Sequence, residues 1–288
     1  MSEHRYCGRA FIEDEVALIA QLCRELPTRI AVARRLCEEL DWRSPNGQPK
    51  AMSARVALLR MERDGLVRLP APTKGNGNHH WPWRLAPGPM PPPLETSLDR
   101  LGQVRLRPLL KRSWRDPETR LWNELIARHH YLGYTPLPGA QLRYFLEADG
   151  HLLGLLGMGA AAWACQPRDA FIGWDRQARQ RNLHLVAGNA RFLILPWVRV
   201  PHLASHALGL LARRLAADWE AAYGYRLLLM ETFVEAGRFA GTSYRAANWT
   251  LVGQTQGRGK LDRHKQFALP VKDVYLLPLS RRFRSLLA

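Results

Sequence analysis

The first seventy residues repeat apolar positions with the spacing of α-helices. Such positions recur three and four residues apart over residues 10–26, over residues 29–40 and from Ser53 to Asp64, which predicts three short helices. Thr28 follows Pro27 and is expected to cap the second helix. The alternation from Leu66 to Pro70 then predicts a short strand.

Three short helices and a terminal hairpin indicate a winged-helix domain over residues 1–70. In that fold the third helix enters the DNA major groove and the wing touches the backbone. The predicted DNA contacts are Lys50, Ser53, Arg55 and Arg60 on the third helix and Arg68 on the wing. The alternative is a three-helix adaptor that holds a partner protein.

A proline-rich stretch separates this region from the rest of the chain. Residues 71–97 contain many prolines and several glycines, and proline-rich spacers are stiff and do not join sheets. We interpret residues 71–97 as a linker and residues 98–288 as a second domain with a basic C-terminal tail.

The second domain mixes helical and strand patterns. Asp149-Gly150 lies between two apolar runs, which is a strong hairpin signal. The glycines of the second run predict a close approach of another part of the chain. The pattern therefore predicts an α+β domain, with strands at 141–148, 151–161, 189–197, from Leu227 and at 249–252, and helices at 117–129, at 202–222 and near Tyr244.

The charge balance favours a polyanionic partner. The formal net charge is +17 and the sequence pI is about 10.5. A charge of this size attracts nucleic acid first and an anionic membrane surface second, and it says nothing about the fold. Most of the basic residues are Arg, which suits bidentate phosphate contacts, although a GC-rich genome also favours Arg codons.

Cysteine spacing and hydropathy indicate where the protein resides. Cys7, Cys23, Cys37 and Cys165 form no C-x-x-C pair, which argues against a zinc ribbon. No signal peptide and no apolar run of membrane-spanning length is present. We therefore expect a cytoplasmic protein with reduced cysteines and no membrane partner.

The stretch from Gly241 to Lys260 combines closely spaced glycines with basic side chains. Glycines let a backbone approach a ligand, and the neighbouring Arg258 and Lys260 suggest that the ligand is anionic. With Arg191, Arg245 and Arg263 they complete the DNA contacts predicted for the second domain. The alternative is a tight hairpin with a solvated basic tip.

The element order of the second half resembles the GNAT acyltransferase fold. The segment MET…YRAANWTLVGQT also resembles the GNAT ending, with a tyrosine on a short helix before the last strands. This resemblance implies a GNAT-like mixed sheet. GNAT enzymes hold the coenzyme A pyrophosphate on a Gly-rich loop before the long helix. Residues 199–205 contain no glycine, which argues against coenzyme A binding.

Longer strings resemble the family of the Druantia anti-phage protein DruA, whose relatives are often described as transposases or mobile-element proteins. They are HHYLGY at 129–134, RDAFIGW at 168–174, NARFLILPWVRVPHLASH at 189–206 and ETFVEAGRFAGTSYRAANWTLVGQTQGRG at 231–259. The N-terminal string LDWRSPNGQPKAMSARVALLRMERDGLVRLP resembles the leading domain of the same family. The resemblance implies DNA as the target, in mobility or defence, and assigns no active site.

Three side chains are candidates for strand cleavage or joining. Tyr244 would attack a phosphate, and Glu231 or His130 would handle the proton. Arg191 and Arg258 would stabilise the developing charge. The structural alternatives are a packing tyrosine, a strand-end carboxylate paired with an arginine, and a turn histidine.

Three further functions remain open. A metal-dependent nuclease would bring Asp149, Asp169 and Glu231 around a divalent ion such as Mg²⁺. A DNA-binding subunit would need no chemistry, and a GNAT-type transferase would modify nucleic acid. The expected partners are DNA, a second copy in a homodimer, or other defence proteins.

Overall fold

The computed structural model describes residues 4–44, 47–72, 91–109, 113, 115–257 and 269–288. The chain divides into two compact units, residues 1–82 and residues 83–288. Each unit has its own buried core, and the larger unit contains the sheet that positions the candidate site.

The smaller unit packs three helices against a short hairpin. Phe11 and Trp42 meet edge to face with ring centroids 5.6 Å apart, in a core that includes the buried Cys23 and Cys37. The hydroxyl of Thr28 accepts a hydrogen bond from the backbone amide of Ala31, which confirms the predicted cap. The elements are β1 (His4–Tyr6), β2 (Arg9–Phe11), α1 (Glu13–Glu25), α2 (Arg29–Glu39) and α3 (Ala51–Arg63).

The predicted strand at residues 66–70 is wrong. The hairpin of this unit precedes α1, whereas residues 66–72 form neither helix nor strand. Side chains bind the backbone of this segment instead. Glu62 accepts from the amide of Leu69 at 3.1 Å, and Arg29 donates to the carbonyl of Pro70 at 2.7 Å. Thus no wing follows α3 within the described residues, and the winged-helix assignment is not confirmed.

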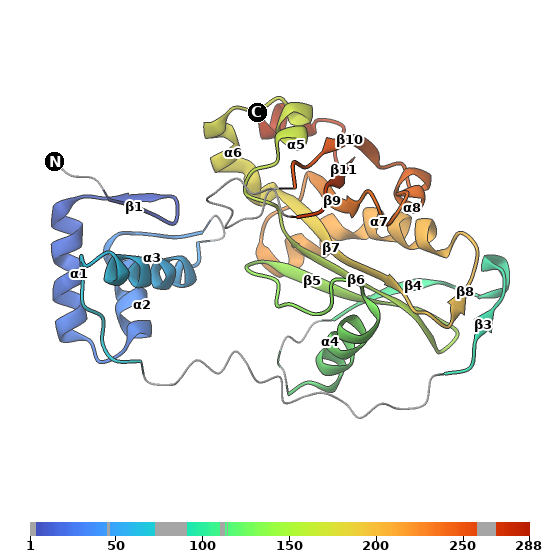
Figure 1. Ribbon diagram of the computed structural model, residues 1–288, viewed down its shortest axis with the longest axis horizontal. Coiled ribbons are helices and arrows are strands. Elements are labelled where there is room, and N and C mark those ends of the chain that lie inside the picture. The colour runs from blue at the N-terminus through green and yellow to red at the C-terminus, as the bar shows by residue number, and fades with distance from the viewer. Residues whose placement is uncertain (1–3, 45–46, 73–90, 110–112, 114, 258–268) are drawn as a thin grey trace. The chain divides into compact units, whose positions relative to one another are not determined.

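The larger unit is built on a seven-stranded sheet with the order β10-β11-β9-β7-β6-β5-β4 (Figure 1). The β7–β9 pair is parallel, and the other neighbouring pairs of this sheet are antiparallel. The element order is the one expected for a GNAT-like mixed sheet. The strands are β4 (Arg105–Pro108), β5 (Gln141–Ala148), β6 (His151–Ala160), β7 (Val186–Ile194), β9 (Leu229–Glu235), β10 (Thr250–Gln254) and β11 (Lys272–Pro278).

Two helices cover opposite faces of the sheet (Figure 1). On β5, Arg143 bonds Asn123 of α4 (Pro117–His129), and the next residue, Tyr144, bonds Asp218 of α7 (Leu203–Tyr223). Consecutive strand residues point to opposite faces, so α4 and α7 must lie on different sides. The glycine prediction for β6 is confirmed at Gly157, where an added Cβ would lie 3.1 Å from the Trp122 ring.

Several elements of this unit were not expected from the sequence. The segment around Arg168 contains two short helices instead of a plain connection, and β11 lies in the predicted basic tail. The apolar residues of the two short helices pack with those of β9 and β11 in a second hydrophobic cluster. The additional elements are β3 (Leu94–Glu95), α5 (Gln166–Ile172), α6 (Arg176–Asn182), β8 (Val198–Arg199) and α9 (Phe283–Leu287), besides β4, β11 and short 3₁₀ turns.

Candidate functional site

A pocket opens where the two parallel strands of the sheet diverge. β7 and β9 pair over three residue pairs, from Val186 with Leu229 to Gly188 with Glu231. Beyond that point the two described strands separate, and a cavity of about 570 Å³ lies between them. This volume is in the range of small-molecule sites. The short helix α8 (Thr242–Ala246) and the end of α4 complete its walls.

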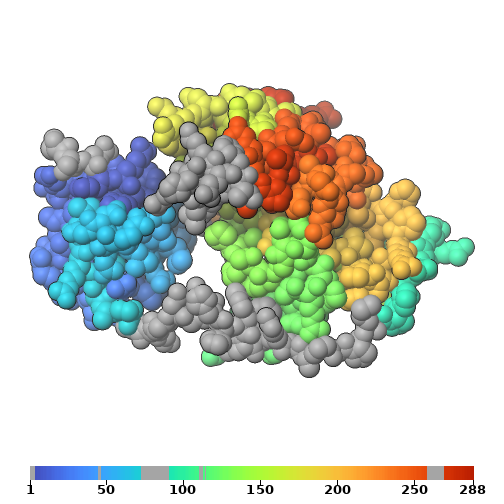
Figure 2. Space-filling model, viewed as in Figure 1, coloured from blue at the N-terminus to red at the C-terminus, as the bar shows by residue number. Residues whose placement is uncertain are grey.

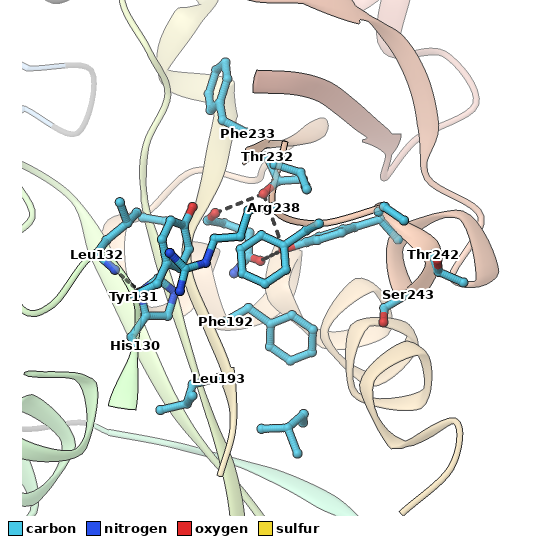
Figure 3. Close-up of a pocket in the computed structure, with 18 of the residues that line it drawn as sticks. His130, Tyr131, Leu132, Phe192, Leu193, Thr232, Phe233, Arg238, Thr242 and Ser243 are labelled. Atoms are coloured by element: carbon cyan, nitrogen blue, oxygen red, sulfur yellow. Dashed lines mark hydrogen bonds between the residues drawn. The ribbon is translucent and has the colours of Figure 1, made fainter. Parts of the chain in front are cut away.

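Three neutral side chains form the polar floor of the pocket (Figure 3). The hydroxyl of Tyr244 donates to Asn189 Oδ1 at 2.7 Å, and the Thr232 hydroxyl lies 3.2 Å from the Asn189 carbonyl. Tyr244 is held by rings on several sides, including Trp249 and Tyr275. Burial raises the pKa of the Tyr244 phenol. The floor therefore holds an un-ionised tyrosine hydroxyl in a satisfied hydrogen-bond network.

The rim of the pocket is aromatic and carries a cation. The rings of Tyr131 and Phe239 meet at 5.1 Å, and the guanidinium of Arg238 lies 4.8 Å from the Tyr131 ring centroid (Figure 3). In the space-filling view the green segment after α4 lies beside the orange segment before α8 (Figure 2). Leu132 and Phe239, two of the exposed large apolar residues, both lie on this rim. Two segments distant in sequence thus build one rim.

The lining of the pocket includes an arginine and no carboxylate. All of its lining residues are described, and none of them is Asp or Glu. Burial, together with the charges of Arg191 and Arg238, lowers the pKa of His130 to about 4. His130 Nδ1 accepts from the Leu132 amide at 3.2 Å, so the neutral ring carries its proton on Nε2. His130 is therefore a neutral donor on the pocket wall.

Arg191 lies behind the pocket wall. Its guanidinium donates to the carbonyls of Gly133 at 3.1 Å and Ala190 at 2.7 Å. Burial lowers its pKa. Arg191 fixes the backbone after His130 and adds positive charge without touching the cavity directly.

Glu231 does not reach this pocket. It neighbours Thr232 on β9, and alternate strand residues point to opposite faces. Its carboxylate accepts from Arg168 Nη1 at 2.9 Å and from the Ala162 amide at 2.7 Å. Burial raises the pKa of Glu231, and the charge of Arg168 acts in the opposite direction. The structure brings Tyr244 and His130 to one pocket and places Glu231 elsewhere.

The carboxylates considered for a metal site are held by arginine instead. Asp169 and Glu231 both bind the guanidinium of Arg168, which lies between them, and Asp169 also binds Arg179 at 2.8 Å. Asp149 lies in the β5–β6 turn. Among the residues that the structure describes, no group of three His, Cys, Asp or Glu side chains is placed to hold a metal ion.

The other cations predicted for this unit lie apart from the pocket or outside the described residues. Arg245 is exposed on α8 and donates to the Tyr275 hydroxyl at 3.1 Å. Arg258, Lys260 and Arg263 fall in residues 258–268, outside the part of the chain that the structure describes.

Helix α3 of the smaller unit presents a basic and partly apolar face. Lys50 at its start, Arg55 and Arg60 are exposed and have no acidic partner within the described residues, and Arg68 is exposed beyond its end. Ser53 is partly buried. The same helix exposes three large apolar side chains, Met52, Val56 and Leu59. This face has both the charge to meet phosphates and the apolar surface to meet a protein.

The start of α7 lacks the features of a phosphate loop. His202 precedes the helix with φ of 64° and provides no side-chain cap. No glycine lies in the described residues 199–205. The start of α7 therefore has no glycine-rich loop of the kind expected for a coenzyme A pyrophosphate.

Four residues of the pocket were not singled out from the sequence. Asn189 and Thr232 are polar residues within apolar strands, and that interruption of the pattern is the signal that marks them. Arg238 and Phe239 lie three and four residues after the carboxyl end of β9, a strand that borders the divergence. Ligands of open α/β sheets lie beyond such strand ends.

These features define an α+β domain built around a diverging parallel strand pair. The family model described as "Druantia protein DruA" matches residues 93–269, which is more than half of the chain. The chain therefore belongs to the family of the Druantia protein DruA. No curated protein matches it.

Solved acetyltransferases show a weak overall similarity. An N-acetyltransferase from Staphylococcus aureus Mu50 is 16% identical, with 62% of this chain and 100% of that chain covered and a TM-score of 0.37. An aminoglycoside acetyltransferase bound to coenzyme A and kanamycin is 14% identical, covering 64% of this chain and 98% of that chain, with a TM-score of 0.39. Similarities at this level carry no conclusion about function. No helix in the described ranges is long and apolar enough to cross a bilayer.

Proposed function

We propose that this protein acts in anti-phage defence by binding DNA, and that it does so without forming a covalent bond to the strand. Membership of the DruA family supports the defence role. One observation supports DNA binding: cations without acidic partners gather on two surfaces. Some other arginines are paired with carboxylates, as Arg35 is with Glu39 and Arg214 with Asp218.

The two surfaces are the outer face of α3 and the mouth of the pocket. Lys50, Arg55 and Arg60 have no carboxylate partner among the described residues, and the same is true of Arg238 on the pocket rim. Uncompensated guanidinium groups attract phosphates and release counterions when they bind them. This arrangement favours a polyanion over a neutral or cationic ligand.

The pocket favours binding over strand cleavage or transposase-like joining. A tyrosine nucleophile needs a base to remove its proton. The Tyr244 hydroxyl donates to the side-chain oxygen of Asn189, and its pKa is raised. Glu231 is buried in an ion pair with Arg168. His130 is neutral but carries its proton on Nε2, and its Nδ1 already accepts from the backbone. The geometry therefore provides no free base for Tyr244 within the described residues.

DNA binding by the whole chain tests the proposal. Affinity for a short duplex should fall steeply as salt rises, and Arg238→Gln should weaken binding at low salt about severalfold. Arg213→Gln is the matched control, because Arg213 is an exposed arginine of α7 that does not line the pocket. Absence of DNA binding at low salt would refute the proposal.

The same samples test the absence of chemistry. Incubation with DNA and Mg²⁺ should yield neither nicked strands nor a protein–DNA adduct. An adduct that Tyr244→Phe abolishes would replace the binding role with the nucleophilic one.

A further inference from the structure

We infer that the pocket between β7 and β9 binds a nucleotide whose base is unpaired. The inference deepens the proposed function, because the nucleotide would belong to a bound strand. It also extends to a free nucleotide, which shares the same chemistry. The pocket volume, its exposed apolar rim, its charge and its polar floor each restrict the ligand.

The exposed apolar rim favours a ligand with a flat apolar group. Phe239 is 43% exposed and Leu132 is 43% exposed, although both border a cavity. Apolar side chains exposed together around a concave site mark a ligand-binding surface. Arg238 lies against Tyr131 and Phe239, with its guanidinium carbon 4.8 and 5.6 Å from the two ring centroids. Aromatic rings and guanidinium planes are the surfaces on which unpaired bases stack.

The positive charge of Arg238 favours a ligand that carries an anionic group beside its flat group. Arg238 has no carboxylate partner among the described residues, and its lining neighbours include no acid. Glu235, at the end of β9, does not line the cavity, but burial and then the charge of Glu235 raise the pKa of Tyr131 on the rim. A nucleotide combines a planar ring with a negative charge. A cationic ligand would be repelled by the positive charges of Arg238 and Arg191.

The polar groups fit a neutral, hydrogen-bonding base rather than a second charge. His130 is neutral and keeps a proton on Nε2, which makes it a donor to a base or sugar oxygen. Thr242 and Ser243 add hydroxyl groups on the opposite wall (Figure 3). A hydroxyl donates and accepts alike, so these groups match a base edge of either kind.

The cavity excludes a base that remains paired. A base within a duplex is covered on both faces by its neighbours and on one edge by its partner. To enter a side-chain-lined pocket it must leave the stack, which costs least at strand ends and mismatches. The pocket should therefore prefer DNA with an unpaired terminal base over a fully paired duplex of the same length.

Fluorescence of 2-aminopurine tests this preference in the full chain. Three probes are compared: a duplex with one unpaired terminal 2-aminopurine, the same duplex with that base paired, and free 2-aminopurine deoxyribonucleoside monophosphate. We expect the unpaired end to bind about tenfold tighter than the paired duplex and to change its emission on binding.

Phe239→Ala should remove the tenfold preference for the unpaired end. Because Phe239 is exposed, its loss should not damage the core, and a thermal melt checks this. Trp163→Ala is the matched control, since Trp163 is 59% exposed and does not line the pocket. Arg238→Gln is the second variant and should weaken all probes that enter the pocket.

The outcomes separate this inference from DNA binding itself. Equal affinity for paired and unpaired ends, unaffected by Phe239→Ala, overturns the inference and leaves the proposed function standing. Binding of the free monophosphate alone, weakened by Phe239→Ala, supports a free nucleotide as the source and refutes DNA binding. Preference for the unpaired strand end without binding of the monophosphate supports the strand as the source.

Discussion

Arg168 and Glu231 form an ion pair in which neither side chain is exposed to solvent. Arg168 also donates to the Ala162 carbonyl at 2.7 Å and binds Asp169, so its donors bridge β9, α5 and the end of β6. A buried charge is tolerated only when it is paired and hydrogen-bonded. The pair therefore holds α5 against the sheet.

Removal of one partner should destabilise the protein strongly. Glu231→Gln leaves the Arg168 charge without one of its two carboxylates, and we expect a loss of about 3 to 5 kcal/mol in the free energy of unfolding. Chemical denaturation measures the loss. Glu95→Gln is the control, because Glu95 and Arg199 pair in solvent, where the expected loss is about 0 to 1 kcal/mol. A stable Glu231→Gln protein would restore Glu231 as a catalytic candidate.

His130 should titrate well below an ordinary histidine. Its pKa is lowered from 6.5 to about 4, so the unfolded chain binds more protons than the folded one between these values. Stability contributed by neutral His130 is thus complete above about pH 6.5 and is lost as the pH falls toward 4. NMR titration of the ring measures the value directly.

The same titration tests the assigned causes. Arg238→Gln should move the pKa of His130 upward, because one of its positive neighbours is removed. An ordinary pKa in the wild-type protein would show that the ring is solvated and that the wall beside Tyr131 is open.

At the scale of elements, α8 depends on the residue that precedes it. Gly241 has φ of 67°, in the left-handed region, and an added Cβ would collide with the Tyr275 hydroxyl. Tyr275 in turn stacks on Tyr244 at 5.8 Å. One glycine thereby sets the position of the tyrosine on the pocket floor.

Gly241→Ala should destabilise the protein by at least about 1 to 2 kcal/mol from backbone strain alone, before the clash with Tyr275 is added. Gly237→Ala is a matched control from the same segment, since its backbone is unstrained and no atom lies within 4 Å of the added Cβ. Thermal melts of the two variants provide the comparison. Equal melting temperatures would show that α8 moves without cost.

The apolar pattern of the sequence predicts the long helices and strands, but it does not predict the short ones. The bounds of α4 and β5 agree with the apolar pattern, because each buries one continuous face. The α5 and α6 segment has too few residues to repeat a helical period, so it resembled a basic connection. β11 was missed because its place between β9 and β10 depends on pairing with distant strands.

The sequence predicts the candidate site only in part, because the site also depends on contacts between distant segments. Tyr244 and His130 stood out as residues able to do chemistry, but Glu231 was grouped with them by proximity in sequence. Strand alternation, which separates Glu231 from Thr232, was the information needed to divide the group. The rim formed by Tyr131 and Phe239 joins positions that no local pattern connects.

At the scale of the whole molecule, the two units should contribute separately to DNA affinity. The α3 cations and the pocket cations belong to different compact units. Replacing Arg55 and Arg60 together by Gln should reduce the slope of log affinity against log salt by about two. Arg35→Gln is the control, because Arg35 is already paired with Glu38 and Glu39.

An unchanged slope in the double variant would contradict DNA contact by α3. The exposed Met52, Val56 and Leu59 would then be the relevant feature of this face, and the unit would act as an adaptor for a partner protein.

The short parallel pairing of β7 with β9 has a mechanical meaning. Strands β4–β7 form one half of the sheet, and strands β9–β11 form the other. Only the three residue pairs of β7 with β9 join the two halves, so the backbone pairing of the sheet is shortest there. Any rotation of one half against the other changes the angle at this seam and the width of the cavity together. We therefore expect a ligand that fills the cavity to restrict the rotation of one half of the sheet against the other.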